Sequence, residues 1–253
     1  MTKLTFLGKV IPVVLKVSTK IPEITWRWDE RNLDLHFKSF INFSFIAVHC
    51  EFEGEYQEEY FDELYKRSFD LARAAVNLVA FATGYGLTVI LENVIRPDGT
   101  PSVITLQDEA LVSHCTAFSL TPQRTPDFEA VMQIVMTEPA IFRLLNDLIE
   151  SITLPHIAPV NCGRVIDGIN RLISPRRGRK VAWPLMQQAL NLSQAFLEPI
   201  SELAKGPRHG DMAFIPGNKA NEITRRTWII MNRFLEYRKR GNHQLKAPEF
   251  PNL

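Results

Sequence analysis

The sequence contains no long hydrophobic run, since its apolar stretches, such as 78–82 and 228–230, are far shorter than the roughly 20 residues that span a bilayer. The N-terminal stretch 1–23 is basic and partly apolar, but lysines interrupt it and no small-residue cleavage site follows. We interpret this stretch as a strand rather than a signal peptide. We therefore expect no association with a membrane.

Cysteine is scarce: the chain has Cys50, Cys115 and Cys162, with no C-x-x-C pair. An odd number of widely spaced cysteines argues against a disulfide framework and against a zinc site, and it favours a reducing compartment. The sequence therefore predicts a cytoplasmic protein without a bound metal.

The common signatures of nucleotide-binding and hydrolytic enzymes are also missing, including GxxxxGK[ST], GxGxxG, HExxH and GxSxG. The glycines of "ATGYGLT" follow a predicted helix rather than a strand, which is the wrong order for dinucleotide binding. We expect no cofactor. The adjacent His114 and Cys115 lie in an apolar stretch, which favours a buried pair over a catalytic dyad.

The remaining composition is that of a globular protein, with 45% hydrophobic and 23% charged residues. Apolar residues alternate with period two over the first ~50 residues, and "DERN" at 29–32 supplies a turn, so we expect paired β-strands. An apolar stripe at helical spacing from Tyr60 to Phe81, including Leu78, predicts a helix that stops at Thr83–Gly84. Two further strands at 87–95 and 102–106, and an apolar stretch at 111–119, complete this unit.

A proline-containing linker at 120–130 separates the strand-rich part from a helical part. Helices are expected from Asp127 towards Thr153, bent near Pro139, and over 161–173, 182–204 and 221–241. The predicted fold class is α+β. It consists of an N-terminal strand-rich unit with one long helix, residues 1–120, and a C-terminal bundle of about four helices, residues 126–253.

Charge is distributed unevenly between the two halves of the chain. Residues 161–253 contain 16 Lys and Arg against 7 Asp and Glu, whereas residues 1–160 contain 13 against 21. This polarity suggests a polyanion as the partner of the C-terminal half. The alternative is that the two halves neutralise each other within the fold or within a dimer.

The segment "AKGPRHGDMAF", 204–214, places Arg208 and His209 side by side between two predicted helices of the basic half. Histidine titrates near neutral pH, so His209 can act as a general base on a ribose 2′-hydroxyl or as a general acid to a leaving oxygen. Arg208 can clamp a phosphate, and Asp211 can orient the imidazole. A purely structural alternative also stands, because Gly206, Pro207 and Gly210 are typical of a helix stop.

Seven further basic residues of this half would supply a positive field for nucleic acid. They are Arg176, Arg177, Arg179, Lys180, Arg225, Arg226 and Arg233.

A helical bundle with an arginine and a histidine at a helix junction, appended to a strand-containing domain, resembles the HEPN-type domains of bacterial abortive-infection and toxin proteins. That family cleaves RNA without a metal through an R-x(4–6)-H motif. "RNLDLH", from Arg31 to His36, has the spacing but reads as a strand, and "RKRGNH", from Arg238 to His243, crosses a helix end. In "PRHG" the two residues are adjacent, which departs from the motif.

The resemblance implies an RNA- or polyanion-engaging protein that acts as a metal-independent ribonuclease in defence. It also implies a homodimer, because such bundles often build a shared cleft. Two alternatives remain open at this point. One is a non-enzymatic protein that contacts other proteins or itself, and the other is a small-molecule sensor with a pocket between the two halves.

Overall fold

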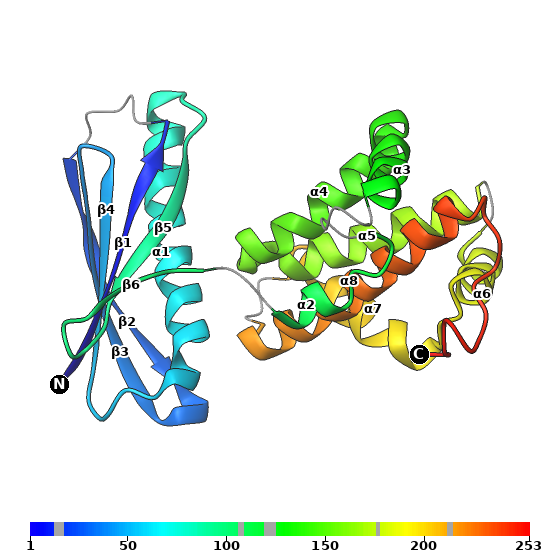
Figure 1. Ribbon diagram of the computed structural model, residues 1–253. Coiled ribbons are helices and arrows are strands. Elements are labelled where there is room, and N and C mark those ends of the chain that lie inside the picture. The colour runs from blue at the N-terminus through cyan, green and yellow to red at the C-terminus, as the bar shows by residue number, and fades with distance from the viewer. Residues whose placement is uncertain (13–17, 106–108, 119–124, 176–177, 212–214) are drawn as a thin grey trace. The chain divides into compact units, whose positions relative to one another are not determined.

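The computed structural model describes residues 1–12, 18–105, 109–118, 125–175, 178–211 and 215–253 (Figure 1). The chain divides into two compact units, Met1–Thr105 and Leu106–Leu253. The first combines a sheet with one long helix and the second is helical, which confirms the α+β class. No helix in the described part of the chain combines the length and apolarity that a membrane span requires.

The first unit is built on a six-stranded sheet in which every pair is antiparallel, in the order β2-β3-β4-β1-β5-β6. The strands are β1 (Thr2–Ile11), β2 (Ser18–Trp28), β3 (Leu33–Asn42), β4 (Phe45–Phe52), β5 (Thr88–Ile95) and β6 (Pro101–Val103). The expected alternation is clear in β3, where Leu35, Phe37 and Ile41 are buried. The predicted turn is a 3-10 turn, Asp29–Arg31, that ends at Asn32 with a left-handed backbone.

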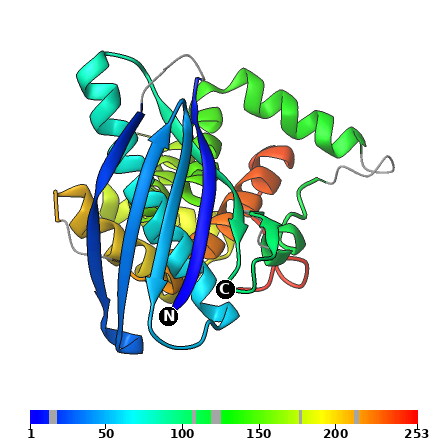
Figure 2. The same cartoon turned by 90° about the vertical axis from the view of Figure 1, so that its left-hand side faces the viewer.

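Helix α1 (Phe61–Thr83) covers one face of this sheet, and Figure 2 looks onto the opposite face. It ends as predicted, because Gly84 adopts φ 72° and donates its N–H to the carbonyl of Ala80 at 2.8 Å. The buried stripe is shorter than the sequence suggested. It ends at Val76, whereas Leu78 and Phe81 are 71% and 91% exposed.

The second unit contains seven helices in the described chain, and α3 to α8 contribute residues to one apolar core. They are α2 (Glu109–Ser113), α3 (Thr125–Thr137), α4 (Pro139–Thr153), α5 (Ala158–Ile173), α6 (Arg179–Leu190), α7 (Gln194–Arg208) and α8 (Gly217–Lys239). The bend expected near Pro139 is a complete break, since Glu138 is extended and Pro139 opens α4. Proline suits this first helical position because it has no N–H to leave unpaired.

The single helix predicted over 182–204 is two helices, α6 and α7. Asn191 ends α6 with a left-handed backbone at φ 52°, and the Ser193 hydroxyl caps α7 by accepting the N–H of Phe196 at 3.2 Å. Helix α7 then continues to Arg208. The loop that we expected over 204–214 therefore begins only at His209.

The boundary between the units precedes the proline-containing linker, so the described stretch 109–118 groups with the helical unit rather than with the first. The backbone N–H groups of Thr116 and Ala117 both donate to the Asn232 side-chain oxygen on α8 at 2.9 Å. Ala117 is fully buried in the core of the helical unit. An apolar stretch alone could not show which of two cores it joins.

Candidate functional site

The predicted catalytic residues lie at the C-terminal end of α7, where the last helical turn closes in a hydrogen-bonded turn. The carbonyl of Gly206 accepts the N–H groups of His209 at 2.9 Å and of Asp211 at 3.0 Å. Gly210 adopts φ 85°, which favours glycine. The structure therefore places Arg208 on the last helical turn and the other two residues just beyond it.

Arg208 lies against α5, and its side chain is about one quarter exposed. Its Nη1 donates to the Asp167 carboxylate at 2.9 Å. Its Nη2 is buried and has no hydrogen-bond partner among the described residues. A Cβ on Gly163 would overlap Nη2 and would come within 2.7 Å of the Arg208 Cζ, so the guanidinium rests where α5 has no side chain.

His209 and Asp211 are exposed, in contrast to Arg208. The Asp211 carboxylate folds back over the helix end, because a Cβ on Gly206 would lie 2.8 Å from its Oδ2. Arg208 and His209 are neighbours in the sequence but have different surroundings: one is docked on a helix and the other faces solvent. The helix end therefore carries a partly buried cation and, on the next residue, an exposed imidazole.

The expected basic surface is only partly present. Arg225 is exposed on α8, whereas Arg226 pairs with Glu222 at 2.7 Å and donates to the carbonyl of Phe196 at 3.1 Å. The Arg226 guanidinium also lies over the Phe196 ring. Of the other predicted residues, Arg179 and Lys180 begin α6, and Arg176 and Arg177 lie outside the described residues.

Arg233 does not belong to the surface. It is 5% exposed, its Nη1 donates to the carbonyls of Leu190 and Asn191 at 2.9 and 2.7 Å, and its Nη2 donates to the Pro251 carbonyl at 2.7 Å. Burial lowers the pKa of Arg233. The side chain satisfies the last carbonyls of α6 and tethers the C-terminal segment, so it is positioned to hold the fold together rather than to meet a polyanion.

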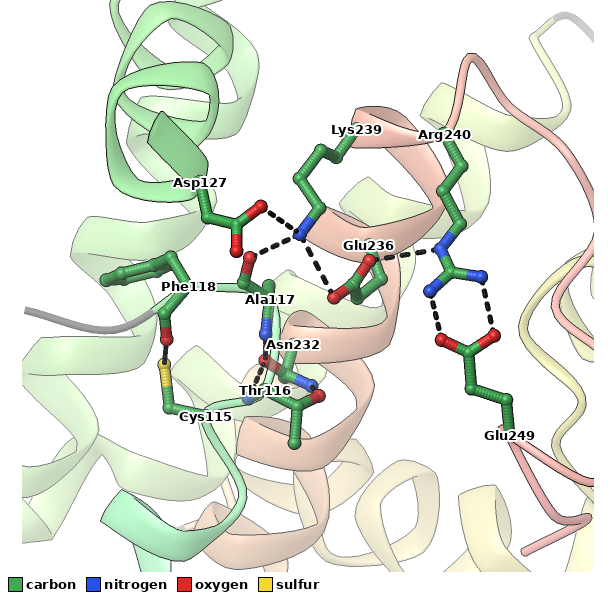
Figure 3. Close-up of polar contacts among 10 residues, drawn as sticks. All are labelled: Cys115, Thr116, Ala117, Phe118, Asp127, Asn232, Glu236, Lys239, Arg240 and Glu249. Atoms are coloured by element: carbon green, nitrogen blue, oxygen red, sulfur yellow. Dashed lines mark hydrogen bonds and ion pairs between the residues drawn. The ribbon is translucent and has the colours of Figure 1, made fainter. Parts of the chain in front are cut away.

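The basic residues at the C-terminal end of α8, like Arg233, make their contacts within the fold, as Figure 3 shows. The buried Glu236 carboxylate accepts hydrogen bonds from Lys239 and Arg240, each at 3.2 Å. Lys239 also donates to the Ala117 carbonyl at 2.6 Å and pairs with Asp127 at 3.2 Å. Lys239, which counted towards the charge of the basic half, thus joins α8 both to α3 and to the segment before α3.

Of the two literal R-x4-H matches, "RKRGNH" crosses the end of α8 as expected, whereas in "RNLDLH" Arg31 lies in the 3-10 turn before β3 and only His36 lies in the strand. Arg238 pairs with Glu138 and donates to the Asn242 side chain at 3.1 Å, and the His243 ring contacts the carbonyl of Arg240. In the sheet, His36 bonds the Thr25 hydroxyl across β2 and β3 at 3.1 Å. Arg238 and His243 therefore sit in contacts that fix a helix end.

Sequence reasoning missed the two residues on α5 that define the surroundings of Arg208. Asp167 carried no signal, since one acidic residue on a predicted helix is ordinary. Gly163 carried a weak one, because a glycine inside a helix costs stability and often marks a close approach of another segment. Within the described ranges, no group of three or more His, Cys, Asp or Glu side chains converges as metal ligands.

Comparison with known proteins identifies both units at the level of domain families. Residues 4–105 match the family described as "Domain of unknown function (DUF8168) N-terminal domain", and residues 128–239 match the corresponding C-terminal domain. No curated protein and no solved structure matches the chain significantly. The two units of this chain therefore match, in order, the N-terminal and C-terminal domain models of the DUF8168 family.

Proposed function

We propose that the helical unit is a HEPN-like, RNA-engaging domain that cleaves RNA without a metal at the C-terminal end of α7. The observation that carries this proposal is the surface pair of Arg208 and His209. The guanidinium is held through one Nη by Asp167, directly before an exposed imidazole. The exposed Arg225, together with Arg179 and Lys180, adds positive charge to the same unit.

The chemistry assigned to these residues is internal transfer to the ribose. His209 takes the proton of a 2′-hydroxyl, the 2′-oxygen forms a bond to phosphorus, and the bond from phosphorus to the 5′-oxygen breaks. Arg208 donates to the phosphate oxygens as negative charge develops on them. The leaving 5′-oxygen takes up a proton from water, and the product is a 2′,3′-cyclic phosphate. Asp211 orients the imidazole of His209.

Cleavage of labelled RNA in the presence of a metal chelator tests this proposal. The set comprises the wild type, Arg208→Ala, His209→Ala and, as a matched control, His243→Ala at the end of α8. We expect cleavage by the wild type and the control, and loss of cleavage in the other two. Equal cleavage by all four proteins, or none by the wild type at any concentration, would contradict the nuclease step.

We propose a cytoplasmic location, in a role such as defence, where RNA is an available polyanion. Cys50, Cys115 and Cys162 form no disulfide among the described residues, which supports a reducing compartment. Cell fractionation with a tagged chain measures the location, and recovery in an oxidising compartment would contradict it.

A second candidate function, a non-enzymatic interaction protein, is favoured by apolar side chains on α3 and α4. Met136 is 71% exposed, Phe142 56%, Met132 44% and Ile149 42%. Phe142 and Ile149 are seven residues apart and share one face of α4. The partner that we propose for this surface is a second copy of the chain. Light scattering should then give twice 29.0 kDa, and Phe142→Glu should return the monomer mass.

A further inference from the structure

We propose that Arg208 occupies an exchangeable docked position over Gly163, and that an RNA phosphate competes with Asp167 for its guanidinium. Helix α5 would then regulate the site, because it holds the arginine away from the ligand until a phosphate displaces the carboxylate. This inference rests on the proposed function. It adds a competing internal anion and identifies Gly163 and Asp167 as the residues that set the strength of binding.

The hold of Asp167 on Arg208 is the kind that a phosphate can replace. It consists of one hydrogen bond, from Nη1 to a carboxylate that is 49% exposed. Ion pairs that face solvent contribute little net stability, because water screens them and both side chains lose freedom. A phosphate can instead accept two parallel N–H bonds from the planar guanidinium, which is the stronger arrangement.

The other end of the guanidinium favours its release as well. Nη2 is buried, and no described residue accepts its hydrogens. A buried donor without an acceptor has lost its bonds to water and gained nothing in return. When Arg208 leaves the surface of α5, Nη2 regains either water or a phosphate oxygen. The docked position is therefore compact, but the residues that the structure describes leave Nη2 of the guanidinium without an acceptor.

Gly163 makes the docked position sterically possible. A Cβ at this residue would overlap Nη2, and it would also lie 2.5 Å from the Cβ of Ala204 on α7. Gly163→Ala alone would therefore push on both the guanidinium and the helix. Combining it with Ala204→Gly removes the second collision and keeps the first. The double variant undocks Arg208 without changing any charge.

The experiment measures binding of a short, fluorescein-labelled single-stranded RNA by fluorescence anisotropy. All proteins carry His209→Ala so that the probe stays intact. We expect Asp167→Asn and the Gly163→Ala, Ala204→Gly pair each to tighten binding by about five-fold, the worth of one exposed ion pair. Glu202→Gln, which removes an exposed carboxylate of α7, is the charge-matched control and should change affinity by less than two-fold.

Arg208→Gln separates this inference from the function on which it rests. We expect it to weaken binding about ten-fold, and to abolish the gain from Asp167→Asn when the two are combined. If Arg208→Gln leaves affinity unchanged, the proposed function itself fails.

If Arg208→Gln weakens binding but neither undocking variant tightens it, only the exchange is overturned. If Asp167→Asn still increases RNA affinity when Arg208 is replaced by glutamine, the exchange is also overturned. The increase would then be a general effect of removing a negative charge. Circular dichroism confirms the fold of each variant, and Asp167→Asn decides the matter if the double variant does not fold.

Discussion

Replacing the buried Arg233 by methionine should destabilise the helical unit and leave RNA binding intact. The methionine keeps the apolar stem but removes the donors to the carbonyls of Leu190, Asn191 and Pro251. Each buried carbonyl left without a donor costs about 1 kcal/mol or more. Relief from burying a charge offsets part of that loss. We therefore expect unfolding to become easier by about 2 kcal/mol, which lowers Tm by roughly 4–8 °C for a chain of this size.

Thermal unfolding followed by far-UV circular dichroism measures this change, because most of the helical signal comes from α2 to α8. Arg225→Met is the matched control, since Arg225 is exposed on the same helix, and its effect should stay within about 0.5 kcal/mol. The reasoning fails if Arg233→Met is as stable as this control. It also fails if Arg233→Met binds RNA more weakly while Arg225→Met does not.

Two more variants and one chemical reaction test the packing within each of the two units. Asn232→Ala removes the acceptor of two N–H groups, of which that of Ala117 is buried and that of Thr116 is partly buried, and should lower the free energy of unfolding by about 2 kcal/mol in urea; a loss below 0.5 kcal/mol would contradict the tether. Gly8→Ala would bring a Cβ within 2.8 Å of the Ile90 carbonyl carbon, so we expect little folded protein in a solubility assay, against full recovery of Gly86→Ala, where a Cβ meets no atom within 4 Å. Burial raises the pKa of Cys50 to about 12, so at pH 8 its thiol is almost fully protonated. A thiol reagent should then modify the half-buried Cys115 first, and early labelling of Cys50 on peptide mapping would contradict its burial.

The sequence predicted the elements whose signals are local. Alternating apolar residues produced β3, and Gly84 ended α1 as expected, because both depend on neighbours within a few positions. The break between α6 and α7 was missed because apolar residues continue at helical spacing across it. The signals that mattered there were Asn191, which tolerates a left-handed backbone, and Ser193, which caps the next helix.

Charge was the least predictable property of the candidate site. A count of basic residues cannot show where their partners lie, and the partners are far away in the sequence. Lys239 contacts Ala117 and Asp127, more than 100 positions earlier. Arg233 meets carbonyls that carry no sequence signal at all. Much of the apparent basic surface is therefore used inside the fold.

The sequence did predict that Arg208 and His209 lie at a helix end, because Gly206, Pro207 and Gly210 are typical of one. Their surroundings were not. Whether Arg208 faces solvent or another helix depends on Gly163 and Asp167, which reach it only through the packing of α5 against α7. Tertiary contacts of this kind decide what a surface arginine can bind.

The salt dependence of RNA affinity tests the central claim most directly, that Arg208 contacts a phosphate of the bound strand. For single-stranded nucleic acid, each phosphate contact contributes a slope of about 0.7 to the plot of log affinity against log salt concentration. Arg208→Gln should weaken binding at low salt and reduce that slope by about 0.7, whereas Arg233→Met should leave it unchanged. An Arg208→Gln protein with the affinity and slope of the wild type would contradict the claim.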